Sequence, residues 1–150
     1  MAFSLYKCPG TSTPPTMRCI ADTAGVVGGQ VVKLEAGTSG ETRPKVVQVT
    51  GDATNSDLAY GVALHDAASG VEVLVMPILS GMRFLADAAA TPDIVNAGTL
   101  KGYLAATAGQ AITINATALT QLQAVIDIVG VSDDLKKYIV AFNPAAVKSF

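Results

Sequence analysis

Residues 58–78 read LAYGVALHDAASGVEVLVMPI, and this stretch decides the fold. Two runs rich in Val, Leu and Ala, at 58–64 and 71–78, flank a polar turn at 65–70 that ends in glycine. Two such runs joined by a short turn containing Gly are typical of an antiparallel β-hairpin. The stretch therefore predicts a hairpin and indicates a mainly β chain.

The flanking sequence continues the same pattern of short strands. Residues 30–34 and 44–49 carry valines in alternating or continuous β-branched runs, and Gly-rich turns separate them. Residues 80–86 follow the hairpin and favour a further strand. Short strands at close spacing with turn residues between them indicate a small β-barrel or β-sandwich.

The second half of the chain repeats the first in outline. Gly25 and Gly29 are echoed by Gly98 and Gly102, and the alternating segment 45–50 is echoed by 110–115. The hairpin at 58–77 is echoed by 124–144, and each copy ends in proline. We therefore predict a single β domain at 23–150, built from two similar four-strand units at about 24–82 and 97–144. Chance similarity between two series of hairpins is the alternative.

Residues 116–129 fit two structures. Leu119, Leu122 and Val125 lie at helical spacing with Ile126 and Val129, as on one face of an amphipathic helix. The repeat instead favours a strand from residue 124. We expect a short helix or turn at 117–123, followed by strand.

The first 22 residues are predicted to form an extended arm. Pro9, Pro14 and Pro15 exclude a regular helix and disfavour a long strand. The apolar side chains of the arm favour ordering against a surface over free disorder. The candidate protein-interaction residues are Phe3, Leu5, Tyr6, Met17 and Ile20. Packing of the arm on its own barrel is the alternative.

The composition suggests a surface that neighbours cover. Charged residues make up 15% of the chain, with a net charge of -2, against about 25% in ordinary domains. Interface cores are poor in Lys, Glu and Asp, although a monomer with a Ser- and Thr-rich surface would share this composition. Because basic residues are scattered apart from Lys136 and Lys137, we expect no nucleic-acid partner. We also expect no membrane span and no signal peptide, and hence synthesis and folding in a cytoplasm.

The residues that chemistry needs are sparse. The chain has one histidine, His65, and two cysteines, Cys8 and Cys19, whose spacing fits neither a zinc site nor a disulfide framework. Asp133 and Asp134 are adjacent in a predicted turn, so we interpret them as solvated. We therefore expect no enzyme: no catalytic residue, no cofactor, no metal and no small-molecule substrate.

The order of these motifs resembles a known family. A Gly-Gln-Val-Val turn at 29–32, a Gly-Val-Ala-Leu strand at 61–64, an Ala-rich turn ending in Gly70 and a Val-rich strand from residue 71 are similar to the capsid cement, or head decoration, proteins of tailed bacteriophages. The resemblance is best over 25–81 and weaker over 98–144. The segments 1–22 and 145–150 lie outside it.

The resemblance implies a structural virion protein that docks on the outer surface of an assembled capsid and stabilises it. It also implies the major capsid protein as partner and a homotrimer as the assembly state. The alternatives are another phage tail, baseplate or glycan-binding β-module, and, less favoured, an enzyme acting on a small molecule.

Overall fold

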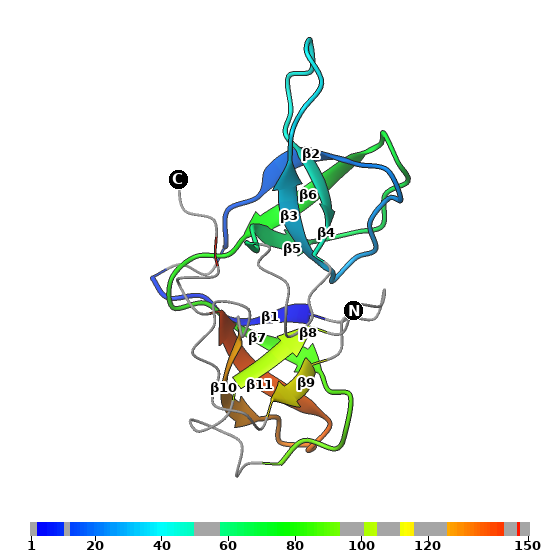
Figure 1. The fold of residues 1–150 in the computed structure, drawn as a ribbon. Helices are drawn as coiled ribbons and strands as arrows, with labels where there is room; N and C mark the ends of the chain where they lie inside the picture. The colour runs from blue at the N-terminus through cyan, green and yellow to red at the C-terminus, as the bar shows by residue number, and fades with distance from the viewer. Residues whose placement is uncertain are drawn as a thin grey trace.

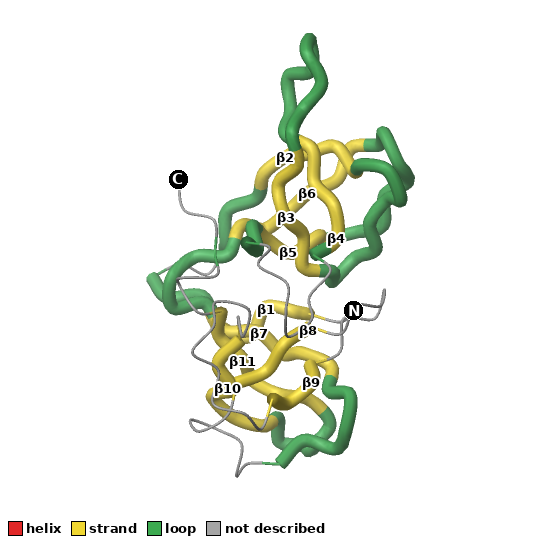
Figure 2. The backbone as a smooth tube through the Cα atoms, in the orientation of Figure 1, coloured by secondary structure: helices red, strands yellow, loops and turns green. Residues whose placement is uncertain are grey.

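A computed structural model describes residues 3–10, 13–49, 58–93, 101–104, 112–115, 126–142 and 147. All regular elements among these residues are β-strands, labelled β1 to β11 in chain order. They form a closed barrel and a separate sheet. In Figure 1 the barrel is the upper part and the sheet is the lower part. Figure 2 colours the described residues as strands and loops, with the longest stretches of loop around the barrel. The prediction of a mainly β chain is confirmed.

The barrel has five strands. They are β2 (Met17–Ala21), β3 (Val31–Glu35), β4 (Lys45–Gln48), β5 (Gly61–Ala63) and β6 (Glu72–Pro77). Their order is β2-β4-β3-β5-β6, and β6 pairs with β2 to close the ring. The β2–β4 pair is parallel, while the other four pairs are antiparallel. The predicted hairpin at 58–78 is confirmed as β5 and β6.

The second sheet has six strands. They are β1 (Phe3–Lys7), β7 (Arg83–Asp87), β8 (Lys101–Leu104), β9 (Ile112–Asn115), β10 (Ile126–Val131) and β11 (Lys137–Phe142). Their order is β1-β7-β11-β10-β8-β9, and every pair is antiparallel. The order β9-β8-β10-β11 within this sheet matches β4-β3-β5-β6 in the barrel.

The predicted boundary between an arm at 1–22 and a β domain at 23–150 does not follow the sheets. Strand β1 pairs with β7 at one edge of the six-stranded sheet, and β2 is part of the closed barrel. The three prolines of this segment fall between the two strands, so they do not interrupt either ladder. The predicted helix or turn at 117–123 lies outside the described residues.

The interior of the barrel is filled mainly by small side chains, and Tyr60 is the one large buried residue of the same cluster. Cys19, Val32, Val46, Ala63 and Val73 are fully buried there. A barrel of few strands leaves little space around its axis, so residues of this size suffice to fill it.

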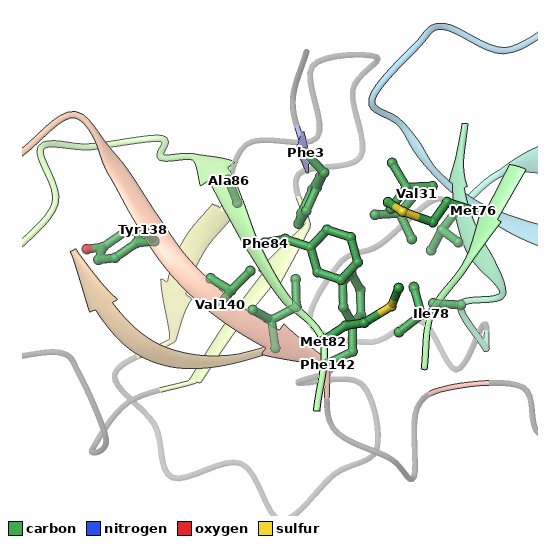
Figure 3. Packing of buried hydrophobic residues seen from close by; sticks show 14 of the residues in the cluster. Phe3, Val31, Met76, Ile78, Met82, Phe84, Ala86, Tyr138, Val140 and Phe142 are labelled. Carbon is green, nitrogen blue, oxygen red and sulfur yellow. The ribbon is translucent and has the colours of Figure 1, made fainter. Parts of the chain in front are cut away.

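A second, larger core joins the barrel to the sheet. Figure 3 shows Val31 and Met76 of the barrel facing Phe84 and Phe142 of the sheet. Val31 and Val32 are neighbours in β3 that are both fully buried, because successive side chains point to opposite faces of a strand. Val32 enters the barrel interior, and Val31 enters the shared core. The outer wall of the barrel is thus one face of the shared core.

Aromatic rings form the centre of the shared core. Phe142 lies between Phe3 and Phe84, with ring centroids 5.8 and 5.6 Å away, and the Phe84 contact is edge-to-face. Edge-to-face contacts are a favoured arrangement of aromatic pairs. Strand β1, which carries Phe3, is further tied to the barrel because the Phe3 N–H donates to the Gly29 carbonyl at 3.0 Å.

Candidate functional site

The five residues predicted to contact partners divide into three groups by their exposure. Phe3 is 1% exposed and belongs to the shared core. Leu5 and Ile20 are half-buried. Tyr6 is 54% exposed and Met17 is 42% exposed. The structure therefore leaves Tyr6 and Met17 at the surface and places Phe3 inside.

Met17 is held in position by a buried neighbour. The Tyr60 hydroxyl donates to the Met17 sulfur at 2.7 Å, and Met17 pairs with Val75 across the β2–β6 ladder. Its side chain is thus exposed at one face and anchored at its sulfur. A flexible, polarizable thioether in this position suits contact with an apolar surface of variable shape.

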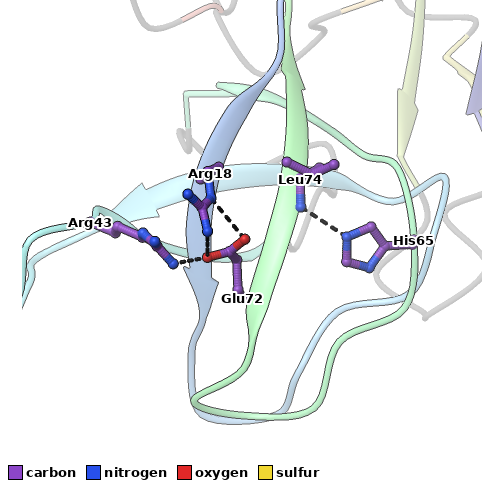
Figure 4. A network of polar contacts seen from close by, with 5 residues as sticks. All are labelled: Arg18, Arg43, His65, Glu72 and Leu74. Carbon is purple, nitrogen blue, oxygen red and sulfur yellow. Dashed lines mark hydrogen bonds and ion pairs between the residues drawn. The ribbon is translucent and has the colours of Figure 1, made fainter.

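A charged cluster lies on the barrel where β2 and β6 meet. Arg18 donates from Nε and Nη2 to the two carboxylate oxygens of Glu72, both at 2.9 Å, and Arg43 also contacts Glu72 (Figure 4). A two-pronged contact of this kind fixes the direction of the guanidinium as well as its distance. Glu72 thereby ties β2 and the end of the β3–β4 loop to β6.

The same loop is held at a second point. Lys45 Nζ lies 3.4 Å from Glu41 and 3.9 Å from Asp22, and it donates to the Thr38 hydroxyl at 3.0 Å. The Glu41 carboxylate accepts the Thr38 N–H at 2.7 Å. Residues 36–42 are exposed, and the loop projects from the barrel in Figure 1. Paired charges at its base thus order an exposed, protruding loop.

An open hollow of about 360 Å³ lies beside this loop. Residues of the β2 end, of the 40–45 segment and of the 69–70 turn line it. Its cations, Arg43 and Lys45, already pair with the carboxylates of Asp22, Glu41 and Glu72. The lining carries two carboxylates, Asp22 and Glu41, against these two cations, and Glu72 outside the lining also pairs with Arg18. Because these charges balance, the hollow presents neither a basic nor an acidic surface, and the ion pairs serve to hold the loop.

His65 is part of the β5–β6 turn. The Leu74 N–H donates to His65 Nε2 at 3.1 Å (Figure 4). His65 Nδ1 lies 2.9 Å from the Asp66 carbonyl oxygen. A backbone N–H can only donate and a carbonyl can only accept, so the neutral ring with its hydrogen on Nδ1 satisfies both contacts. The Asp66 carboxylate accepts the Gly28 N–H at 2.7 Å. Both side chains thus fasten this turn to the barrel.

Burial suppresses the reactivity of Cys19. This side chain is fully buried, and burial raises the pKa of its thiol to about 11. Burial, and secondarily the charge that Cys19 would carry, also raises the pKa of the Tyr60 hydroxyl. Since the thiolate is the nucleophile and the metal ligand, Cys19 acts as a small core residue.

Two features are absent from the part of the chain that the structure describes. No group of three or more His, Cys, Asp or Glu side chains is placed to hold a metal ion in residues 3–10, 13–49, 58–93, 126–142 and 147. Among the described residues there is also no helix of the length and apolarity that would cross a membrane.

The exposed large apolar side chains form the other candidate feature. Sequence patterns indicated only two of them as contact residues. The full set among the described residues is Tyr6, Met17, Val27, Leu58, Val71, Leu79, Val129 and Leu135. Leu135 is the most exposed of these, at 62%. The exposure of Leu135 could have been inferred from the charged residues of the turn around it. The exposure of Val71 could have been inferred from Gly70, which marks the end of a turn.

No protein-family model matches the chain, and no curated protein matches its sequence.

Proposed function

We propose that the chain is a structural virion protein that binds the outer surface of an assembled bacteriophage capsid and stabilises it. Its partner is the major capsid protein, and it assembles as a homotrimer on the virion. The observation that carries the proposal is the set of eight exposed large apolar side chains among the described residues, on a chain with only 15% charged residues. Interface centres combine apolar and aromatic residues with few Lys, Glu or Asp.

Tyr6 and Met17 are the contact residues of the N-terminal segment in this proposal. Tyr, with its apolar ring and polar tip, is enriched at interfaces and at binding hot spots. Both side chains are exposed. Each has one exposed charged neighbour on its strand, Lys7 beside Tyr6 and Arg18 beside Met17, and the other residues of the two strands are buried or half-buried. The remaining predicted residues, Phe3, Leu5 and Ile20, support the contact by holding those strands in place.

The chain consists of two similar β units in this proposal. Support comes from the matching strand order in the two sheets, and it extends to a fifth strand in each. β2 lies antiparallel beside β6, and β7 lies antiparallel beside β11. Two related units in one chain offer two related surfaces, and contacts made together on one particle reinforce each other through their high effective concentration.

The function is non-enzymatic in this proposal. Both ring nitrogens of His65 are engaged in the turn, and Cys19 is held as a buried thiol. Each of these side chains therefore has a structural use that explains its position.

Co-sedimentation with expanded capsids tests the proposal. We expect the protein at micromolar concentration to sediment with capsids and to raise their melting temperature. A Tyr6→Ser variant should bind at least tenfold more weakly while melting as the wild type does, because the Tyr6 side chain is exposed; Met17 is left in place because it also accepts the Tyr60 hydroxyl. Wild-type protein that stays in the supernatant would refute capsid binding, and binding to isolated tails instead would favour a tail module.

A further inference from the structure

Leu135 has a backbone conformation that is unfavourable for leucine, and its apolar side chain is exposed to water. It is the one non-glycine residue among the described ones with a positive φ, at 57°. In this region the Cβ atom approaches the following carbonyl oxygen, so leucine is disfavoured and glycine or asparagine is preferred. Its side chain is also 62% exposed. Folding of the isolated chain thus gains little from leucine at this position.

The turn around Leu135 is held by other groups. The Leu135 N–H donates to the Ser132 carbonyl at 2.9 Å. The Ser132 hydroxyl donates to the Asp134 carboxylate at 2.6 Å and accepts the Lys137 N–H at 3.0 Å, while the Lys136 N–H donates to Asp134 at 3.1 Å. The Ser132 and Lys136 hydrogen bonds lower the pKa of Asp134. These contacts fix the backbone, and the leucine side chain takes no part in them.

The corresponding turn of the barrel provides an internal comparison. Gly70 lies two residues before β6, as Leu135 lies two residues before β11, and its φ is also positive, at 78°. Strands β6 and β11 have equivalent neighbours in their sheets. The turn before β6 thus has glycine, which suits a positive φ, at the position where the turn before β11 has leucine.

We propose that Leu135 is the anchor of a docking site and inserts into an apolar pocket on the capsid surface. The inference rests on the proposed capsid binding and assigns it a contact residue. Binding interfaces can seat an aliphatic side chain in a pocket of the partner, with a polar rim around it. Presentation on a fixed turn means that little conformational freedom is lost on docking.

A charge beside Leu135 specifies the rim of the pocket. Asp133 and Lys136 are exposed. The Lys136 charge acts on the neighbouring Asp134 carboxyl and helps to lower its pKa, whereas Asp133 has no ion pair within the described part of the chain. The pocket therefore fits best with a cation facing Asp133. In Figure 3, Tyr138 near the start of β11 lies away from the barrel residues, and Phe142 at its end lies beside them. The Leu135 turn is consequently at the end of the sheet remote from the barrel.

Three variants separate docking from stability. Leu135→Gly removes the side chain and suits the positive φ, Leu135→Asn suits the positive φ with a polar group, and Leu135→Met keeps an apolar side chain. We expect the glycine and asparagine variants to melt at or above the wild-type temperature and to bind expanded capsids at least tenfold more weakly. The methionine variant should bind within about threefold of wild type, because its volume and polarity are similar.

The results that would contradict the Leu135 anchor differ from the result that would contradict capsid binding itself. Wild-type affinity in Leu135→Gly would overturn the anchor while capsid binding stands. A melting temperature of Leu135→Gly lower by more than about 5 °C would show that leucine is structural, and that would also overturn it. Weaker self-association with unchanged capsid binding would assign Leu135 to a subunit contact. Failure of the wild-type protein itself to bind capsids would remove the proposed function and the anchor together.

Discussion

Replacing Phe84 by alanine should lower the free energy of unfolding by about 4 kcal/mol. The side chain is 0% exposed and lies in the core shared by the barrel and the sheet. Truncating a buried Phe costs about 3–5 kcal/mol, which includes the cavity left behind. The edge-to-face contact with Phe142, at 5.6 Å between ring centroids, places the expected loss in the upper half of that range, because such pairs add about 0.5–1.5 kcal/mol.

Equilibrium urea unfolding measures this loss, and amide hydrogen exchange shows where it falls. Val31 and Met76 of the barrel pack in the same core as Phe84, so we expect amides of β3 and β6 to lose protection together with those of β7 and β11. Tyr6→Ala is the matched control, since this ring is 54% exposed and should cost less than about 0.5 kcal/mol.

Two results would refute this reasoning. A loss below about 1.5 kcal/mol would mean that Phe84 is not tightly packed, because that is the cost of deleting little more than one methylene with its cavity. Wild-type protection in the barrel alongside reduced protection in the sheet would mean that the two do not share a core.

Two further predictions concern the barrel. A Cβ on Gly61 would lie 2.5 Å from Val75 Cγ1 and 2.6 Å from the Met76 carbonyl oxygen, so Gly61→Ala should destabilise by at least about 2 kcal/mol. In Gly130→Ala the nearest contact is 3.5 Å, and a change beyond about 1 kcal/mol, measured by urea unfolding, would contradict this distinction. Burial raises the pKa of Cys19 from 9.0 to about 11, so its contribution to stability is complete below pH 9 and is lost as the pH rises toward 11. That loss is about 2 kcal/mol. In Cys19→Ala, the free energy of unfolding, measured by urea unfolding at several pH values, should fall less steeply over pH 9–11. An unchanged slope would refute the raised pKa of the Cys19 thiol.

The hairpin of β5 and β6 was predictable because its strands and its turn are adjacent in the chain. Local pairing needs only the alternation of 58–64 and 71–78 and the glycine at the end of the turn. The closure of the barrel was not predictable in this way. Strands β2 and β4 pair in parallel although β3 lies between them in the chain. Nothing in the sequence of either short strand specifies so distant a partner.

The N-terminal contact residues show what was missing from the sequence interpretation. Five apolar residues were treated alike, as positions on one arm. Once β1 is a strand, its side chains alternate, so Phe3 and Leu5 share one face and Tyr6 points to the other. The observed burial of Phe3 and exposure of Tyr6 follow that alternation. The prolines made two short strands hard to predict, because Pro9 closely follows β1 and Pro15 closely precedes β2.

The exposure of Leu135 could have been predicted, although its backbone conformation could not. Asp133, Asp134, Lys136 and Lys137 surround it, and burying the leucine would bring these charges out of water at a cost far above the gain from one apolar side chain. The sequence signal of such a residue is an apolar side chain inside a run of charges. Its positive φ depends on how β10 and β11 are joined, and the comparison with Gly70 becomes available only when both turns are seen in their sheets. Exposure alone makes a leucine unremarkable, but exposure together with an unfavourable φ on a turn fixed by other groups singles it out for binding.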